Sequence, residues 1–235
     1  MLLPPLCLLC SGRVQLAHGL CGGCWSQIQF IDEPRCPQWG EPFAFDAGPG
    51  ALSARALTRQ PAWKNLRAAV LYDVASRQLV HALKYHDRLE AGRLMARLMQ
   101  RAAADLLRKP AVLVPIPLHP WRPWQRRYNQ AAVLANHLAR QTGLAMQPQV
   151  IERRRATRSQ VGLGEPERRA NLKDAFQVPD RSAAEVVGRH IVLIDDVLTT
   201  GATASAACQC LLEAGAAGVD VVAFAMAAHP AAMHA

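Results

Sequence analysis

The segment that most constrains the fold is an apolar run that leads directly into two adjacent carboxylates and a short loop of Thr and Gly. In order, it consists of Ile191-Val192-Leu193-Ile194, Asp195-Asp196, Val197-Leu198 and Thr199-Thr200-Gly201-Ala202-Thr203. We expect a buried strand over 190–194 and a helix over 203–214. A strand followed by a tight loop and a helix is the repeating unit of an α/β fold, in which ligands bind beyond the carboxyl ends of parallel strands.

The chain from residue 61 onward repeats this alternation of strand and helix. Apolar runs predict strands over 66–72, 112–116 and 219–225, and helical spacing predicts helices over 89–108 and 130–142. Ser76 is expected to cap a further helix that carries Leu79, Val80 and Leu83 on one face. The predicted fold class is therefore α/β, a parallel sheet with helices on both faces. The charged stretch 152–175 is expected to be a long loop that is either mobile or functional.

The loop after the two acids has the chemistry of an anion site. Its backbone N–H groups and the start of the following helix form a cradle, the Thr hydroxyls donate hydrogen bonds, and Gly201 allows close approach. Carboxylates repel a bare phosphate but suit sugar hydroxyls, or a Mg²⁺ ion that bridges to phosphates. The alternative is an Asp–Asp turn before a well-capped helix.

Residues 1–60 differ from the rest because they hold five of the seven cysteines. The paired spacing Cys7-x2-Cys10 and Cys21-x2-Cys24 brings four thiolates to the corners of a tetrahedron, which suits Zn²⁺. Four Cys ligands leave no open position, so the site is expected to be structural. The alternatives are a redox pair or four unrelated thiols. We therefore expect a small zinc-ribbon domain over 1–60 and a second domain over 61–235.

A second metal site is not expected. Cys36 begins another knuckle, but Trp39 stands where its second sulfur is needed. Cys208 and Cys210 lie in the predicted last helix and are interpreted as small core residues. The sequence therefore predicts one zinc ion per chain.

The chain is basic, with 27 Lys and Arg against 18 Asp and Glu, a formal charge of +9. Arg122, Arg126 and Arg127 follow the predicted strand 112–116 beside Trp121 and Trp124. Such residues suit phosphate contacts or a single-stranded nucleic-acid groove, and a solvated loop is the alternative. Lys84 is a further substrate candidate or a surface lysine. The histidines are interpreted as structural or surface residues: His18, His81, His137 and His190.

No segment approaches the ~18 apolar residues that a membrane span needs. The odd number of cysteines suits a reducing compartment, so we expect a cytoplasmic protein.

The segment 191–203 resembles the phosphoribosyl-diphosphate (PRPP) motif of type I phosphoribosyltransferases. The resemblance implies that Asp195 and Asp196 hold the ribose hydroxyls and that the loop Thr199–Thr203 holds the 5′-phosphate, with Mg²⁺ accompanying PRPP. Purine-specific members often have Asp at the position of Thr199. Its absence argues against purine salvage and leaves the catalytic base unknown.

The whole chain resembles the ComF/GntX family, which joins a double zinc ribbon to a phosphoribosyltransferase-like domain. The similarity runs from about Pro5 to Ala227 and rests on the four cysteines and on the segments Lys84-Tyr85-His86, Val114-Pro115-Ile116-Pro117-Leu118-His119, Arg127-Tyr128-Asn129-Gln130-Ala131, Ala156-Thr157-Arg158-Ser159-Gln160, Arg168-Arg169-Ala170-Asn171-Leu172 and Ala175-Phe176. The family's second pair of knuckles is replaced here by Cys36/Trp39 and Ser53/Ala56.

This resemblance implies further roles for the basic residues and for the chain. The candidates for pyrophosphate or phosphate contact are Arg126, Arg127, Asn129 and Lys84, and the stretch 152–175 corresponds to a flap over PRPP. The family is associated with natural competence, in which single-stranded DNA is handled beside a helicase-like partner. We therefore expect a PRPP-binding protein linked to uptake of single-stranded DNA. The alternatives are an active Mg²⁺-dependent phosphoribosyltransferase with an unknown acceptor and a PRPP-sensing regulator.

Overall fold

A five-stranded parallel sheet forms the centre of the molecule. The computed structural model describes residues 4–85, 89–108, 110–118, 128–154 and 175–228. The strand order is β1-β7-β6-β2-β3, and every neighbouring pair is parallel. The strands are β1 (Leu66–Leu71), β2 (Val112–Pro115), β3 (Ala145–Met146), β6 (His190–Leu198) and β7 (Gly218–Met226). The predicted parallel α/β sheet is confirmed.

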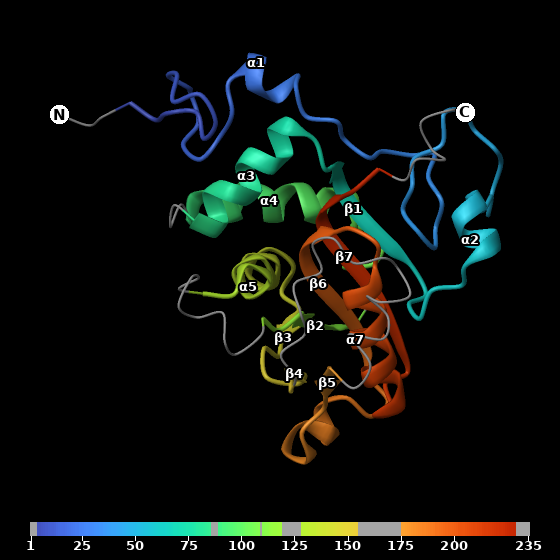
Figure 1. Ribbon diagram of the computed structural model, residues 1–235. Helices are drawn as coiled ribbons and strands as arrows, with labels where there is room; N and C mark the ends of the chain where they lie inside the picture. The colour runs from blue at the N-terminus through green and yellow to red at the C-terminus, as the bar shows by residue number, and fades with distance from the viewer. Residues whose placement is uncertain (1–3, 86–88, 109, 119–127, 155–174, 229–235) are drawn as a thin grey trace.

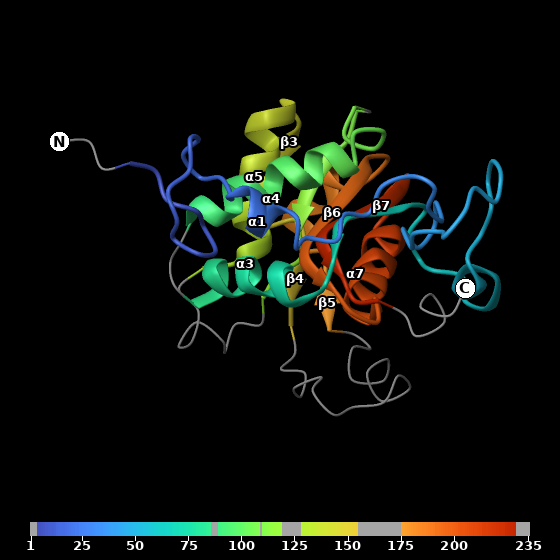
Figure 2. The ribbon, with the colours of Figure 1, turned by 90° about the horizontal axis from the view of Figure 1, so that it is seen from above.

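Helices cover both faces of this sheet, as Figures 1 and 2 show. One face carries α3 (Val74–Tyr85), α4 (Leu89–Ala102) and α5 (Gln130–Thr142), and the other carries α7 (Ala202–Glu213). The smaller elements are α1 (Gly22–Trp25), α2 (Ala54–Thr58), η1 (Asp180–Glu185) and an antiparallel pair of strands, β4 (Glu152–Arg153) and β5 (Phe176–Gln177). None of the helices within the described ranges is long and apolar enough to cross a membrane.

The alternation of side chains along β6 divides the core into two layers. Val192 and Ile194 pack with α3, α4 and α5, whereas Ile191 and Leu193 pack with α7. This is the pattern of a strand buried on both faces. Cys208 is fully buried in the α7 layer, which confirms its interpretation as a small core residue.

Among the element boundaries that differ from the sequence predictions are those of helices α3 and α4. Helix α3 begins at Val74, and Asp73 caps it instead of Ser76. The two residues form a reciprocal pair, in which Ser76 N–H donates to Asp73 Oδ1 at 2.7 Å and Asp73 N–H donates to Ser76 Oγ at 2.8 Å. Helix α4 ends at Ala102, before the predicted end at 108.

Strand β6 is longer than predicted, because it runs through the two acids to Leu198. Strand β7 supplies the partner, since Asp195, Val197 and Leu198 stand opposite Ala223, Ala225 and Met226. A carboxylate normally opposes strand formation, but continuous pairing with a neighbour overrides that local preference. The predicted end at residue 194 is therefore wrong.

The N-terminal region wraps around the free edge of β1. Leu71 N–H donates to the Gln29 carbonyl and Ile31 N–H to the Ala69 carbonyl, while Leu66 N–H donates to the Pro37 carbonyl. These bonds cover an edge that would otherwise expose unpaired backbone groups. The segment before residue 29 consequently lies on the α3–α4 side, and the segment after it packs into the α7 layer.

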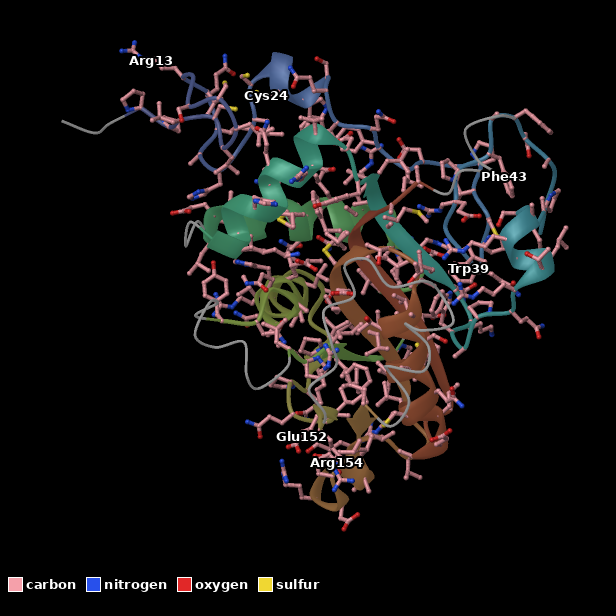
Figure 3. The ribbon with its side chains drawn as sticks, in the orientation of Figure 1. Arg13, Cys24, Trp39, Phe43, Glu152 and Arg154 are labelled. Carbon is pink, nitrogen blue, oxygen red and sulfur yellow. The ribbon has the colours of Figure 1, made fainter. Side chains whose placement is uncertain are left out.

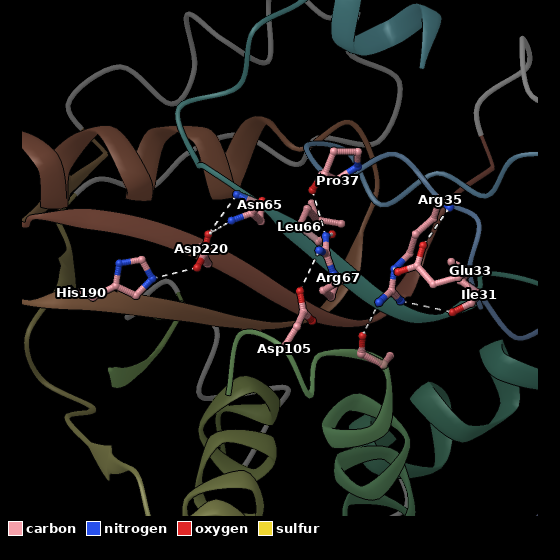
Figure 4. A network of polar contacts seen from close by, with 11 residues as sticks. Ile31, Glu33, Arg35, Pro37, Asn65, Leu66, Arg67, Asp105, His190 and Asp220 are labelled. Carbon is pink, nitrogen blue, oxygen red and sulfur yellow. Dashed lines mark hydrogen bonds and ion pairs between the residues drawn. The ribbon is translucent and has the colours of Figure 1, made fainter. Parts of the chain in front are cut away.

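Hydrogen bonds and ion pairs of buried polar groups hold the N-terminal region against the sheet and stabilise the neighbouring strands (Figure 4). Arg67 on β1 donates to the Pro37 carbonyl at 2.9 Å and pairs with Asp105 at 2.8 Å. Asp220 is fully buried on β7 and accepts hydrogen bonds from Asn65, and it lies 2.7 Å from His190 Nε2. The sequence spacing assigned no partner to His190, whereas the structure gives it this carboxylate.

Candidate functional site

The candidate site lies where the sheet connections reverse direction. From β2 the chain passes through α5 to β3 on one side, and from β6 it passes through α7 to β7 on the other. The carboxyl ends of β2 and β6 therefore border the crevice in which open α/β sheets bind ligands. Pairing between these strands stops at Pro115 and Ile194, so the next residues of β6 have β7 as their strand partner.

The two carboxylates stand at this point. Both are partly buried, and Lys84 at the end of α3 reaches Asp196, with Nζ 2.5 Å from Oδ2. Asp195 Oδ1 accepts from Asp196 N–H at 2.9 Å, and Asp196 Oδ1 accepts from Val197 N–H at 2.8 Å. The structure thus brings Lys84 and the acid pair together, although Lys84 contacts a carboxylate here.

Burial and the neighbouring charge of Asp196 raise the pKa of Asp195 to about 8, against the opposing effects of the Asp196 backbone N–H and Lys84. Two adjacent carboxylates in a partly buried place repel each other, so one of them retains its proton near neutral pH. A divalent cation or a pair of sugar hydroxyls would stabilise the doubly ionised form. The donor set therefore fits Mg²⁺ or a ribose diol.

The Thr-Gly loop makes a tight turn into α7. Gly201 has φ +78° in the left-handed region, and its carbonyl accepts the Ser205 N–H at 2.8 Å. Thr200 Oγ1 accepts from the Ala202 N–H at 3.4 Å. The loop thus precedes a helix N-terminus, the arrangement that favours an anion. Thr199 is exposed, Thr200 and Thr203 are partly buried, and Gly201 and Ala202 are buried.

Residues from the N-terminal region form the wall behind this loop. A Cβ added at Gly201 would lie 2.8 Å from Trp63 and 3.2 Å from Trp39. Arg55 donates to the Thr200 carbonyl at 2.8 Å, and its guanidinium lies 3.6 Å from the centre of the Trp39 ring. Sequence reasoning missed this wall. Two sequence features could have indicated it. Trp39 occupies one knuckle position, and Arg55 lies between the knuckle positions of Ser53 and Ala56.

Of the remaining residues predicted to contact phosphate, Asn129 is the one that lies within the described part of the chain. Asn129 caps α5, because its Oδ1 accepts from Ala131 N–H at 3.0 Å while its Nδ2 donates to the Ile116 carbonyl at 3.0 Å. It therefore ties the start of α5 to the end of β2. The other basic candidates lie outside the described residues: Arg122, Arg126 and Arg127, with Trp121 and Trp124. Most of the predicted flap, 155–174, lies outside them as well, and β4 and β5 pair at its base.

The four paired cysteines converge on one point. The sulfurs of Cys7, Cys10, Cys21 and Cys24 all lie within 4.8 Å of one another. Cys10 and Cys21 have sulfurs 3.6 Å apart, and zinc–sulfur bonds of about 2.3 Å would place tetrahedral sulfurs about 3.8 Å apart. The Cys21 N–H also donates to Cys7 Sγ at 3.3 Å. This cluster fits a structural zinc ion, as the spacing predicted.

The thiols of the cluster differ in their pKa values. Burial raises the pKa of Cys7, but hydrogen bonds from the Cys10 and Cys21 backbone outweigh it and lower the value to about 6. Burial and the neighbouring thiols raise the pKa of Cys24 to about 12. Four thiolates at such distances need a cation to balance their charge.

The second half of the ribbon is built without metal ligands of this kind. The positions of its missing knuckles are all buried, at 0%, 1%, 9% and 6% exposure for Cys36, Trp39, Ser53 and Ala56. Ser53 caps α2 by accepting from the Ala56 N–H at 3.4 Å. Figure 3 shows Cys24 on α1 and Trp39 near β1, so the two halves occupy separate places on the molecule.

Two protein-family domains match the chain. The double zinc ribbon domain matches residues 1–56, and the phosphoribosyl transferase domain matches residues 81–234. The chain belongs to the phosphoribosyl transferase domain family and carries an N-terminal double zinc ribbon.

Curated relatives share both parts. The DNA utilization protein YhgH of Salmonella typhimurium is 37% identical over 224 residues, covering 93% of this chain and 95% of the relative. Competence protein F of Haemophilus influenzae is 31% identical over 221 residues, covering 92% and 94%. The chain is therefore a member of the ComF family.

Among solved structures, the phosphoribosylpyrophosphate synthetase of Mycobacterium smegmatis is similar at 21% identity and a TM-score of 0.35, over 60% of this chain and 35% of that chain.

Proposed function

We propose that the crevice at the carboxyl end of β6 binds PRPP or a related phosphorylated ribose. The observation that carries this proposal is the adjacency of Asp195 and Asp196 to a glycine turn and a helix N-terminus, at the reversal point of a parallel sheet. Carboxylates bind the diol of a ribose, while the loop amides and Thr hydroxyls bind its 5′-phosphate. Membership of the phosphoribosyl transferase family supports the same ligand.

The surrounding residues would complete this site. Asp195 and Asp196 would accept from the ribose hydroxyls or hold Mg²⁺, which supplies positive charge next to a pyrophosphate. Lys84, 2.5 Å from Asp196, would exchange the carboxylate for a phosphate oxygen when ligand binds. Asn129 would act indirectly by fixing the end of β2 through the Ile116 carbonyl. Arg126 and Arg127 stay candidates for the pyrophosphate.

Isothermal titration of the full chain with PRPP, in the presence and absence of Mg²⁺, tests this proposal. We expect PRPP binding that depends on Mg²⁺. Asp195→Asn and Asp196→Asn should each weaken this binding at least tenfold, which corresponds to about 1.4 kcal/mol. Asp32→Asn is the matched control, because Asp32 is an exposed acid paired with Arg101 on another part of the chain. Undetectable binding of PRPP and ribose 5-phosphate by the wild type would exclude the proposal.

For the cellular role, we propose that the protein takes part in the use or uptake of single-stranded DNA in the cytoplasm, beside a helicase-like partner. The names of the relatives support this role. A surface patch also supports it. The ring centroids of Trp25 and Phe30 lie 4.9 Å apart on this patch, and the Arg101 guanidinium lies 5.9 Å from the centre of the Phe30 ring. Arg97 is exposed one turn earlier on α4. Aromatic faces stack on bases and arginines follow phosphates, so this surface suits a single strand.

Binding of a fluorescent oligonucleotide at increasing salt tests this part. Affinity that falls steeply with salt, and that weakens about tenfold in Trp25→Ala, supports the role. Leu57→Ala is the control, because Leu57 is an exposed apolar side chain on α2. A wild type that does not bind at low salt would exclude direct contact with DNA.

The alternative functions use the same pocket. An active Mg²⁺-dependent phosphoribosyltransferase would release pyrophosphate from PRPP when its acceptor is supplied, and a PRPP-sensing regulator would change its affinity for a partner without turnover. A pyrophosphate-release assay across candidate acceptors separates them, since turnover supports an enzyme. Partner binding that responds to PRPP in the absence of turnover supports a regulator.

A further inference from the structure

We propose that Arg55 is a positioning residue for the phosphate loop, so that the metal-free half of the ribbon determines the shape of the anion site. The guanidinium makes two different contacts. Its NH1 group lies 3.2 Å from Glu41 Oε1, and its NH2 group donates to the Thr200 carbonyl at 2.8 Å. The inference rests on the proposed function of the loop as a phosphate binder.

The contact with the Thr200 carbonyl matters because it orients the peptide plane between Thr200 and Gly201. In a trans peptide the carbonyl and the following N–H point in opposite directions. Because the Thr200 carbonyl points toward Arg55, the Gly201 N–H points away from Arg55 and from the ribbon. Arg55 therefore fixes the direction of one of the backbone donors that an anion would use.

The arginine is itself held rigidly. Its side chain and that of Glu41 are each 7% exposed, and its guanidinium lies 3.6 Å from the centre of the Trp39 ring. Trp39 is anchored in turn by a hydrogen bond from Nε1 to the Arg59 carbonyl at 3.0 Å. A planar guanidinium between a carboxylate and an aromatic face has little freedom, so the loop carbonyl meets a preorganised donor.

The tryptophans restrain the same loop from the same side. Trp63 is 4% exposed, donates from Nε1 to the Gln38 carbonyl at 2.7 Å, and comes within 2.8 Å of the position of a Gly201 Cβ. Arg55 of the ribbon thus holds the Thr200 carbonyl, while Trp39 and Trp63 leave no room for a side chain at Gly201. Its second half, which lacks the paired cysteines of the first, has become part of the wall of the site.

Hydrogen exchange of the ligand-free full chain and titration with PRPP and Mg²⁺ test this inference together. Arg55→Lys is the informative variant, because an ammonium keeps a charge beside Glu41 but cannot donate through a fork to both partners. We expect amide exchange over 199–205 to become about tenfold faster and the PRPP dissociation constant to rise about tenfold. Arg55→Met should produce the same local change with a larger loss of stability.

Arg67→Met is the matched control. Arg67 is also a buried arginine that donates to the ribbon, at Pro37, but this partner and the others, Leu66 and Asp105, lie outside the loop. It should lower stability while leaving exchange over 199–205 and PRPP affinity within about twofold of the wild type. Unchanged exchange in Arg55→Lys, or equal acceleration in Arg67→Met, would overturn the inference. If the wild type does not bind PRPP, the proposed function fails, whereas the exchange measurement still decides the role of Arg55.

Discussion

The two halves of the ribbon reach order by different means. The first half gathers four sulfurs within 4.8 Å of one another and has little apolar core of its own. The second half places Cys36, Trp39 and Ala56 in the α7 layer of the main core, with a buried Arg55–Glu41 pair beside them. The first half needs a metal ion, whereas the second half uses packing against the sheet.

This contrast shows how a ribbon half without four cysteines can be stabilised. A tetrahedral thiolate site satisfies all its ligands internally and needs no contact with the rest of the protein. The second half has Trp39, Ser53 and Ala56 at three of its four knuckle positions, and it is stabilised by packing against neighbouring surfaces. These surfaces include Gly201 and Thr200, so the second half of the ribbon packs directly against the candidate site.

Removal of the metal should have the largest effect and should be confined to the first half. We expect one zinc per chain in the wild type and none in Cys24→Ala, with a loss of local folding free energy on the order of 10 kcal/mol. Elemental analysis and hydrogen exchange over 4–28 measure both. Cys36→Ala is the control and should retain one zinc. Two zinc ions per chain, or zinc loss in the control, would break the comparison.

Breaking the buried ion pair should be the largest single change in the second half. Glu41→Gln leaves the Arg55 charge without its carboxylate, and we expect the free energy of unfolding in urea to fall by about 3–5 kcal/mol. Asp32→Asn breaks the exposed pair with Arg101, so it should cost about 1 kcal/mol or less. Equal costs in the two variants would mean that the pair does not stabilise the second half.

The contact between the ribbon and Gly201 has its own test. Gly201→Ala combines a positive φ with a clash against Trp63, and we expect a loss of about 2–4 kcal/mol. Gly48→Ala is matched to it, since Gly48 has φ +88° but no atom within 4 Å of the added Cβ, so its cost should be about 1–2 kcal/mol. Thermal unfolding of both variants isolates the cost of the clash. A Gly201 variant no worse than the Gly48 variant would contradict close packing.

The last expected effect is a gradual one, a difference in pH dependence between the acid pair and the zinc cluster. Because the folded-state pKa of Asp195 is raised to about 8, the folded protein holds a proton that the unfolded chain releases near pH 4. Stability contributed by this group should therefore fall as pH rises from about 4 to about 8, by at most about 1.4 kcal/mol per pH unit. Asp195→Asn should lack this decline in urea titrations. The zinc half should show the opposite sign, since acid protonates thiolates and releases metal. A decline that persists in Asp195→Asn would assign it to other groups.

Elements whose signals are local could be predicted from the amino-acid sequence. Helix α5 spans Gln130–Thr142 as predicted, because an Asn cap, an apolar stripe and a terminal Gly143 all lie within the segment. The spacing of the four cysteines and the order of acids, Thr and Gly were equally local, so the zinc cluster and the position of the candidate site were foreseeable. The domain boundary at residue 60 and the ligands of the site stay predictions.

Contacts between distant segments, which complete these elements, could be learned only from the folded protein. Strand β6 continues to Leu198 because β7 pairs with it, and His190 is fixed by Asp220. Arg55 contacts Thr200 across a separation of 145 residues, and Lys84 reaches Asp196 from another element. Sequence patterns describe neighbours within a few turns of chain, whereas these contacts depend on which surfaces the folded sheet brings together.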